Sequence, residues 1–156
     1  MTNLNITISY KDTMRRVYTE TGYTAQARSN VGLSPELSDS MSATEEDKRI
    51  LENEFIAAAK DAGSLITRYM TPCDVKFIKD SNNVTDVTQL VFAVPDNFPS
   101  EVVSTLEKSI EEFITSHIIQ RWVIIMKPDE ANIHAIKMQN ETIRIREILA
   151  ARKKPQ

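Results

Sequence analysis

The chain has 156 residues, of which 41% are hydrophobic and 26% are charged, and its formal net charge is −3. This length is typical of one domain, and the charge excludes a strongly basic nucleic-acid binder at the level of the whole chain. Apolar runs such as Trp122–Met126 are too short to span a membrane. The N-terminus lacks the basic and apolar regions of a signal peptide, and a lone cysteine, Cys73, favours an intracellular or virion setting.

The N-terminal part predicts a short strand followed by a helix. Apolar and polar residues alternate over 4–10, which is typical of a strand or of an extended N-terminal arm. Apolar residues then recur at helical spacing over 11–21, and Gly22 is expected to end that helix. Residues 22–43 contain two of the three glycines and only isolated apolar residues, so we expect an arm or loop there. It is either a mobile loop or an arm that orders on a neighbouring subunit.

The middle of the chain predicts a long helix and a β-hairpin. Thr44 begins a capping box, and helical periodicity continues until Pro72. Small residues at 58, 59, 62 and 63 would let another helix approach closely. The hairpin is expected over 74–94, and because two strands alone are marginal, it must pack on helices or pair with another strand.

The C-terminal part predicts two antiparallel helices. Ser100 is expected to be the N-cap of a helix that reaches Met126 and is apolar nearly all round from Ile118 onward. That stretch must be surrounded, either inside a bundle, with Trp122 in the core, or at a subunit interface. Pro128 begins the last helix, and residues 151–156 form a basic tail. The apolar side of the last helix comprises Ile133, Ile136, Asn140, Ile143, Ile145, Ile148 and Leu149.

Together these elements predict a mainly α fold: one domain over residues 1–156, built as a small bundle of three to four helices with one β-hairpin and an extended N-terminal arm. Charge is unevenly distributed, because residues 73–128 are mildly acidic and residues 129–156 are basic. Two copies could therefore meet head to tail, an arrangement that gives rings when the rotation closes.

Residues with catalytic or metal-binding chemistry are scarce. Glu130 and His134 share a spacing that a metal site can use, but two ligands do not make a site. Cys73 follows Pro72 and is expected to be a small buried side chain, and His117 a hydrogen-bonded core residue. We therefore expect no catalytic residue, no metal and no cofactor. An enzyme would require Cys73, Glu130 and His134 to converge in one pocket.

The basic C-terminal residues Arg152, Lys153 and Lys154 could contact phosphates. Interleaved aromatic residues, which would stack on single-stranded nucleic acid, are absent there. A solvated tail or ion pairs with an acidic partner surface are the other interpretations.

Several segments together resemble small structural proteins of tailed bacteriophages and, in helix order, the head–tail connector (adaptor) family. The resemblance covers residues 10–155 and rests on pattern. It is carried by Thr21-Gly22-Tyr23-Thr24, Ala43-Thr44-Glu45-Glu46-Asp47, Phe98-Pro99, Ile118-Ile119-Gln120-Arg121-Trp122, Pro128-Asp129-Glu130-Ala131 and the basic end.

This resemblance implies a non-enzymatic virion protein that forms a homo-oligomeric ring, a connector or neck/tail adaptor between portal and tail proteins. Its lumen would pass DNA with only transient, non-specific contact, and no membrane would be involved. Subunit contacts would involve Tyr23, Leu33, Leu37, Met41, Phe77, Phe92, Arg152, Lys153 and Lys154. The alternative is a small helical protein that docks on a host protein and regulates it.

Overall fold

The computed structural model describes residues 1–30, 48–79, 85–126 and 128–152. It is mainly helical with a small antiparallel sheet, which confirms the predicted fold class. In chain order, the elements are β1 (Thr2–Ser9), α1 (Tyr10–Asn30), α3 (Lys48–Tyr69), β2 (Asp74–Lys79), β3 (Thr85–Val94), α4 (Val103–Met126) and α5 (Ala131–Leu149). Short 3-10 turns, Ser100–Val102 and Pro128–Glu130, precede α4 and α5.

The sheet has the strand order β1-β3-β2, with both neighbours antiparallel to β3. The predicted hairpin is β2 and β3, and its third partner is the N-terminal segment of the same chain. Asn5 and Asp74 both lie opposite Val91. The N-terminus is therefore a strand of the chain's own sheet and does not extend away as an arm.

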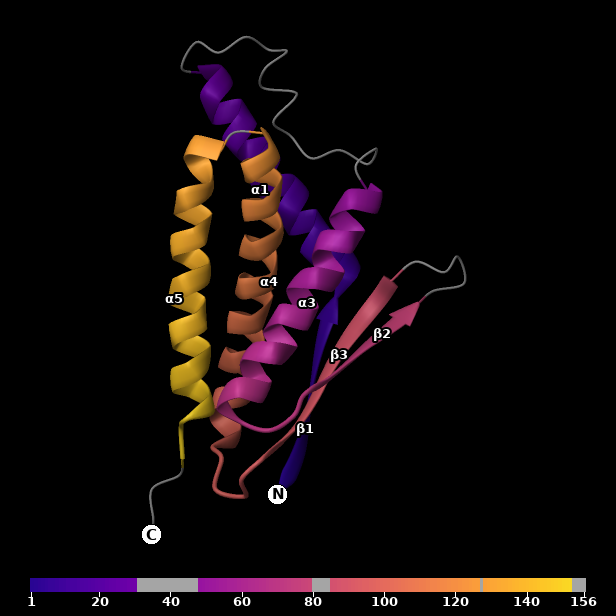
Figure 1. Cartoon of the computed structure of the whole chain (residues 1–156), viewed down its shortest axis with the longest axis vertical. Coiled ribbons are helices and arrows are strands. Elements are labelled where there is room, and N and C mark those ends of the chain that lie inside the picture. The colour runs from indigo at the N-terminus through magenta and orange to yellow at the C-terminus, as the bar shows by residue number, and fades with distance from the viewer. Residues whose placement is uncertain (31–47, 80–84, 127, 153–156) are drawn as a thin grey trace.

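Helix α4 occupies the centre of the molecule and contacts α1, α3, α5 and β1 (Figure 1). Ile118, Ile119, Trp122 and Val123 are all buried, so the predicted apolar stretch is surrounded by its own chain up to that point. Between the two predicted environments, the middle of a bundle is the correct one for these residues. Helix α5 lies alongside α4 and runs antiparallel to it (Figure 1), as expected.

Helix α3 lies against both α4 and the hairpin, and small residues make the close approach possible. Ala58, Ala59 and Ala62 are buried. A Cβ at Gly63 would overlap with Cγ2 of Val75 on β2. The small residues of this helix thus admit a strand on one side, whereas we expected only a helix.

One predicted helix end and one predicted N-cap are wrong. Helix α1 continues through Gly22 to Asn30, so residues 22–30 are helical and not part of an arm; residues 31–43 lie outside the described part. Pro99 is the N-cap residue of the turn before α4, and Ser100 is its first residue. The last helix starts as predicted, with Pro128 leading into α5. The start of the capping box, Thr44, is outside the described residues.

Helix α1 is joined to its neighbours by an ion pair and by an aromatic contact. Arg16 of α1 lies 2.9 Å from a carboxylate oxygen of Glu112 on α4 and 3.1 Å from Glu20; the Glu112 hydrogen bond is the main reason that the pKa of Arg16 is raised. At the junction of β1 and α1, the ring of Tyr10 meets Phe55 edge to face at 5.1 Å. In the part of the chain that is described, none of the helices has the length and apolar character that crossing a membrane requires.

Candidate functional site

Helix α5 carries two apolar rows, and the described residues of the chain cover only one of them. The inner row faces α4 and includes Ile145 and Leu149, which are fully buried, and the half-buried Ile148. These residues and Ala131 attach the helix to the core. The sequence predicted a single apolar side; the structure divides it into two opposite faces.

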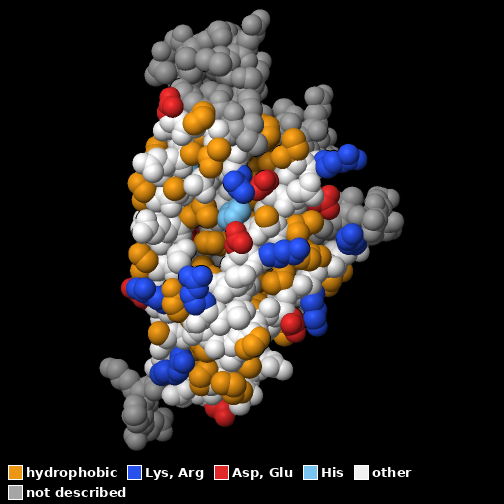
Figure 2. Space-filling view, viewed as in Figure 1, with side chains coloured by type: hydrophobic (Ala, Val, Ile, Leu, Met, Phe, Trp, Pro, Cys, Tyr) orange, Lys and Arg blue, Asp and Glu red, His pale blue; other side chains and the backbone are white. Residues whose placement is uncertain are grey.

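The outer row consists of Ile133, Ile136, Asn140 and Ile143, spaced three, four and three residues apart. Ile133, Ile136 and Ile143 are 61%, 52% and 40% exposed. This spacing keeps side chains on one stripe of a helix and is the spacing with which helices pack on a partner. Figure 2 shows hydrophobic side chains spaced along the left margin of the molecule, over α5.

The outer row is flanked mainly by basic side chains. Lys137, Arg144 and Arg146 are exposed on α5, and Glu147 is the exposed acid near its end. Arg144 also approaches Glu141 of the same helix, with its Nη1 3.4 Å from Oε1. We define the row and these flanking cations as the α5 outer face.

The side of the sheet that faces away from the helices is a second surface that the described residues leave uncovered. Alternation along β3 directs Leu90, Phe92 and Val94 inward, where they are buried. The outward side chains Val87, Val91 and Ala93 are half-buried between the edge strands. Their outward neighbours on the edge strands are exposed: Asn5, Thr7, Asp74, Lys76 and Ile78. We call this surface the outer sheet face.

The interface residues predicted from the sequence differ in how far they are exposed to a neighbour. Phe92 is 2% exposed and belongs to the chain's own core, so it is not available to a neighbour. Phe77 is half-buried and also packs on the core. Arg152 donates hydrogen bonds from Nη1 to the carbonyl oxygens of Leu149 and Ala151, at 2.8 and 2.7 Å, and so caps α5.

The other predicted interface residues cannot be placed in the same way. Tyr23 lies within the backbone range of α1, and its side chain is outside the described part of the structure. The structure does not describe the remaining five predicted residues, Leu33, Leu37, Met41, Lys153 and Lys154.

His117 is a core residue with one hydrogen-bond partner, as predicted. Its Nε2 lies 2.8 Å from Oδ2 of Asp61, which joins α4 to α3. The imidazole also packs at an angle to the ring of Phe113, with centroids 6.2 Å apart. Arg121 and Glu54 add a second α4–α3 contact at 3.5 Å. These contacts give His117 a structural role.

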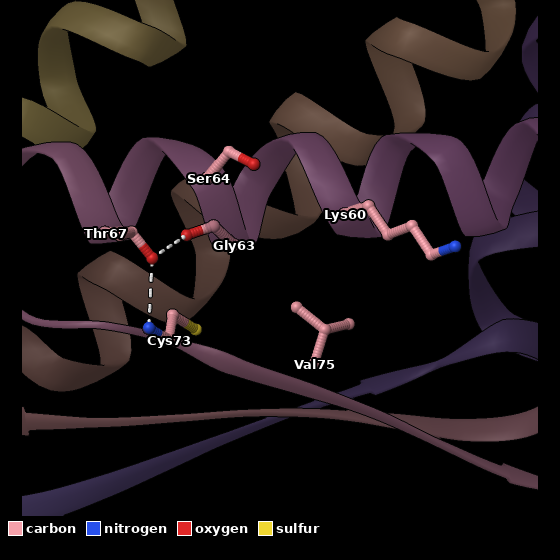
Figure 3. Close-up of a pocket in the computed structure, with 6 residues that line it drawn as sticks. All are labelled: Lys60, Gly63, Ser64, Thr67, Cys73 and Val75. Carbon is pink, nitrogen blue, oxygen red and sulfur yellow. Dashed lines mark hydrogen bonds between the residues drawn. The ribbon is translucent and has the colours of Figure 1, made fainter.

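The hollow in Figure 3 lies between α3 and β2 and has a volume of about 470 Å³. Its polar groups are mostly used within the chain: the Thr67 hydroxyl donates to the Gly63 carbonyl at 2.9 Å and accepts from the Cys73 N–H at 3.0 Å. Burial, with a smaller contribution from Asp74, raises the pKa of the Cys73 thiol to about 11. Because the thiolate is the nucleophile, this cysteine is poorly suited to covalent catalysis. Lys60 is the one charged side chain among the residues that line the hollow.

The residues that an enzyme would require are spread over the fold. Helix α3 ends, and Cys73 follows, at the lower end of the molecule, whereas α5 begins at the upper end with Glu130 and His134 (Figure 1). Burial lowers the pKa of His134, and the charge of Lys137 adds to this shift. Among the described residues, no three His, Cys, Asp or Glu side chains are grouped as a metal site requires.

The outer sheet face was missed from the sequence because both sides of β3 are rich in apolar residues. Thr88, Leu90, Phe92 and Val94 alternate with Val87, Gln89, Val91 and Ala93. Only the position of the helices decides which set is inside. Gln89, a polar residue in the second set, was the only weak indication that this set faces outward.

Comparison of the chain with protein-family models, with curated proteins and with solved structures found no match.

Proposed function

We propose that this protein is a non-enzymatic structural component of a tailed-bacteriophage virion, a ring-forming head–tail connector or neck/tail adaptor. The observation that carries the proposal is the α5 outer face. Three isoleucines stand exposed on one stripe of a helix whose opposite side is already buried in the chain's own core. Several exposed apolar side chains on one stripe of a helix mark an interaction site more often than an isolated exposed hydrophobic residue does.

A second surface supports assembly over regulation of a host protein. The outer sheet face lies on the sheet, while α5 forms the opposite side of the molecule (Figure 1). A subunit with two unlike surfaces on different sides can make the same head-to-tail contact repeatedly, which closes into a ring when the rotation allows it. A protein that docks on one host partner needs only one such surface.

The chemistry of the described residues agrees with a role carried out by surfaces. The thiol of Cys73 has a raised pKa, and His117 is hydrogen-bonded to Asp61. His134 is in the first turn of α5, at the end of the molecule opposite Cys73. In this proposal the helices form the body of each subunit, the subunits contact each other and the portal and tail proteins, and DNA passes through the ring without sequence-specific contact.

The test has two parts, self-assembly and location. Native mass spectrometry of the purified chain should show an oligomer, and electron microscopy of particles that carry a labelled copy should place the label at the neck. A chain that remains monomeric and is absent from purified particles would contradict the proposal. Stoichiometric binding of a monomer to a host protein would favour the alternative role.

A further inference from the structure

A hollow with a volume of about 270 Å³ lies between α4 and α5. It is lined by polar and charged side chains, Thr105, Lys108, Ser109 and Glu112 from α4 and Glu141 and Arg144 from α5. We propose that it binds a small zwitterion, a free α-amino acid, whose ammonium group donates to Glu141 and whose carboxylate lies beside Lys108. Such a site is additional to the proposed role in assembly.

The carboxylate of Glu141 is the group that points to a ligand. The side chain is 13% exposed, and its Oε2 is buried without a hydrogen-bond partner among the described residues. Arg144, one turn further along α5, has its Nη1 3.4 Å from the other oxygen, Oε1, which is long for a charge-assisted hydrogen bond. A buried carboxylate oxygen without a donor is costly, so it is normally supplied with one from protein, water or ligand.

The α4 side of the hollow supplies the opposite charge. Lys108 is exposed and forms no ion pair with any residue that the structure describes. The acid beside it, Glu112, is already paired, with its Oε1 2.9 Å from Nη2 of Arg16. Thr105 and the buried Ser109 add hydroxyl groups to the same lining. A carboxylate in the hollow therefore meets an ammonium group whose charge is not yet compensated.

This mixed charge determines the class of ligand. A simple anion would be repelled by Glu141, and a simple cation would be repelled by Lys108 and Arg144. A zwitterion presents the opposite charge to each of these groups. Pockets for drug-sized ligands have volumes of about 300–1,000 Å³, and this hollow is smaller, which favours a ligand of amino-acid size.

Equilibrium dialysis of the full chain against radiolabelled L-alanine tests the proposal. Binding should saturate at one alanine per chain. Glu141→Gln keeps the shape of the side chain and removes its charge, and Lys108→Met removes the opposite charge. Each variant should weaken binding at least about tenfold, because each loses a hydrogen bond to a charged group.

Matched controls separate the site from the general charge of the surface. Glu147→Gln and Lys137→Met remove the same charges from exposed positions of α5 outside the hollow, and both should bind alanine as the wild type does. Unlabelled N,N,N-trimethylglycine is a zwitterion without an N–H donor, so it should compete at least about tenfold less well than unlabelled alanine. Acetate and methylammonium, which each carry one charge, should also compete poorly. Circular dichroism checks the fold of every variant.

Three results would overturn the proposal. Absence of saturable alanine binding would show that the hollow holds only water. Wild-type affinity in Glu141→Gln and Lys108→Met would place the alanine elsewhere. Equal competition by alanine and N,N,N-trimethylglycine would show that Glu141 accepts no hydrogen bond from the ligand.

Discussion

Gly63 of α3 and Val75 of β2 are so close that any side chain at position 63 would overlap with the valine. This contact sets the distance between the helix and the hairpin, and therefore the position of the sheet that carries the outer sheet face. The close packing of the sheet on α3 thus requires glycine at position 63.

Gly63→Ala should destabilise the protein by about 1–3 kcal/mol, the usual cost of overpacking, reduced by up to about 1 kcal/mol because alanine favours the helix. Urea unfolding followed by circular dichroism measures the change. Adding Val75→Ala should remove the overlap, so that the double variant is more stable than the sum of the single changes predicts. Additive changes would show that α3 and β2 are not in contact there.

Cys73 should react slowly with thiol reagents. A rise in its pKa from 9.0 to about 11 leaves about one hundredth of the thiolate that an ordinary cysteine has at the same pH. Iodoacetamide labelling at pH 8, followed by mass spectrometry, should be about a hundredfold slower in the folded chain than in urea. Equal rates in the two states would mean that the thiol is exposed and available as a nucleophile.

His134 should make the protein less stable in mild acid. Burial and Lys137 lower its pKa below 6.5, against a smaller opposite effect of Glu20. The unfolded chain then binds this proton more readily than the folded chain, so stability decreases as pH falls below about 6.5. Urea midpoints between pH 7.5 and 5.5 should decline less in His134→Gln than in the wild type. The same decline in both chains would contradict the assignment.

Asn140 places a polar amide in the otherwise apolar row of the α5 outer face. If this row is buried on a second copy, Asn140→Leu should tighten self-association about tenfold, because an amide without a partner is costly to bury and leucine is not. Sedimentation velocity over a concentration series measures the effect, with exposed Gln139→Leu on the same helix as the control. Unchanged association of Asn140→Leu would show that the row stays in water.

The sequence predicted the type of most elements, the hairpin of β2 and β3 and the antiparallel pair of α4 and α5, but not the strand that completes the sheet. Alternation over residues 4–10 indicated a strand, yet its partner β3 lies about eighty residues further along the chain, a separation that no local pattern encodes. On α5, periodicity identified the isoleucines and Leu149, missed Ala131 of the core and Met138, which packs against it, and could not tell which of the two rows would face α4. The α5 outer face is the row that the sequence could not distinguish from the row packed on α4.

Gly22 shows a different cause of error. Glycine costs a helix about 1 kcal/mol relative to alanine, which made it a plausible end for α1. The following segment, Ala25-Gln26-Ala27-Arg28, consists of good helix formers and offsets that cost, and α1 continues to Asn30. Phe92 was expected at a subunit contact because it lies on the hairpin, which was thought to pair with a neighbouring subunit, but the inward side of β3 places it in the core.

The mass of the wild-type chain in solution is the most direct test of the account, since one subunit is 17.7 kDa. Native mass spectrometry over increasing protein concentration should reveal species that are integral multiples of this mass, and Ile136→Asp should shift them to the single subunit while Ile50→Asp does not. A species of 17.7 kDa alone at every concentration, for the wild type as for Ile136→Asp, would contradict the claim that these surfaces assemble copies of the chain.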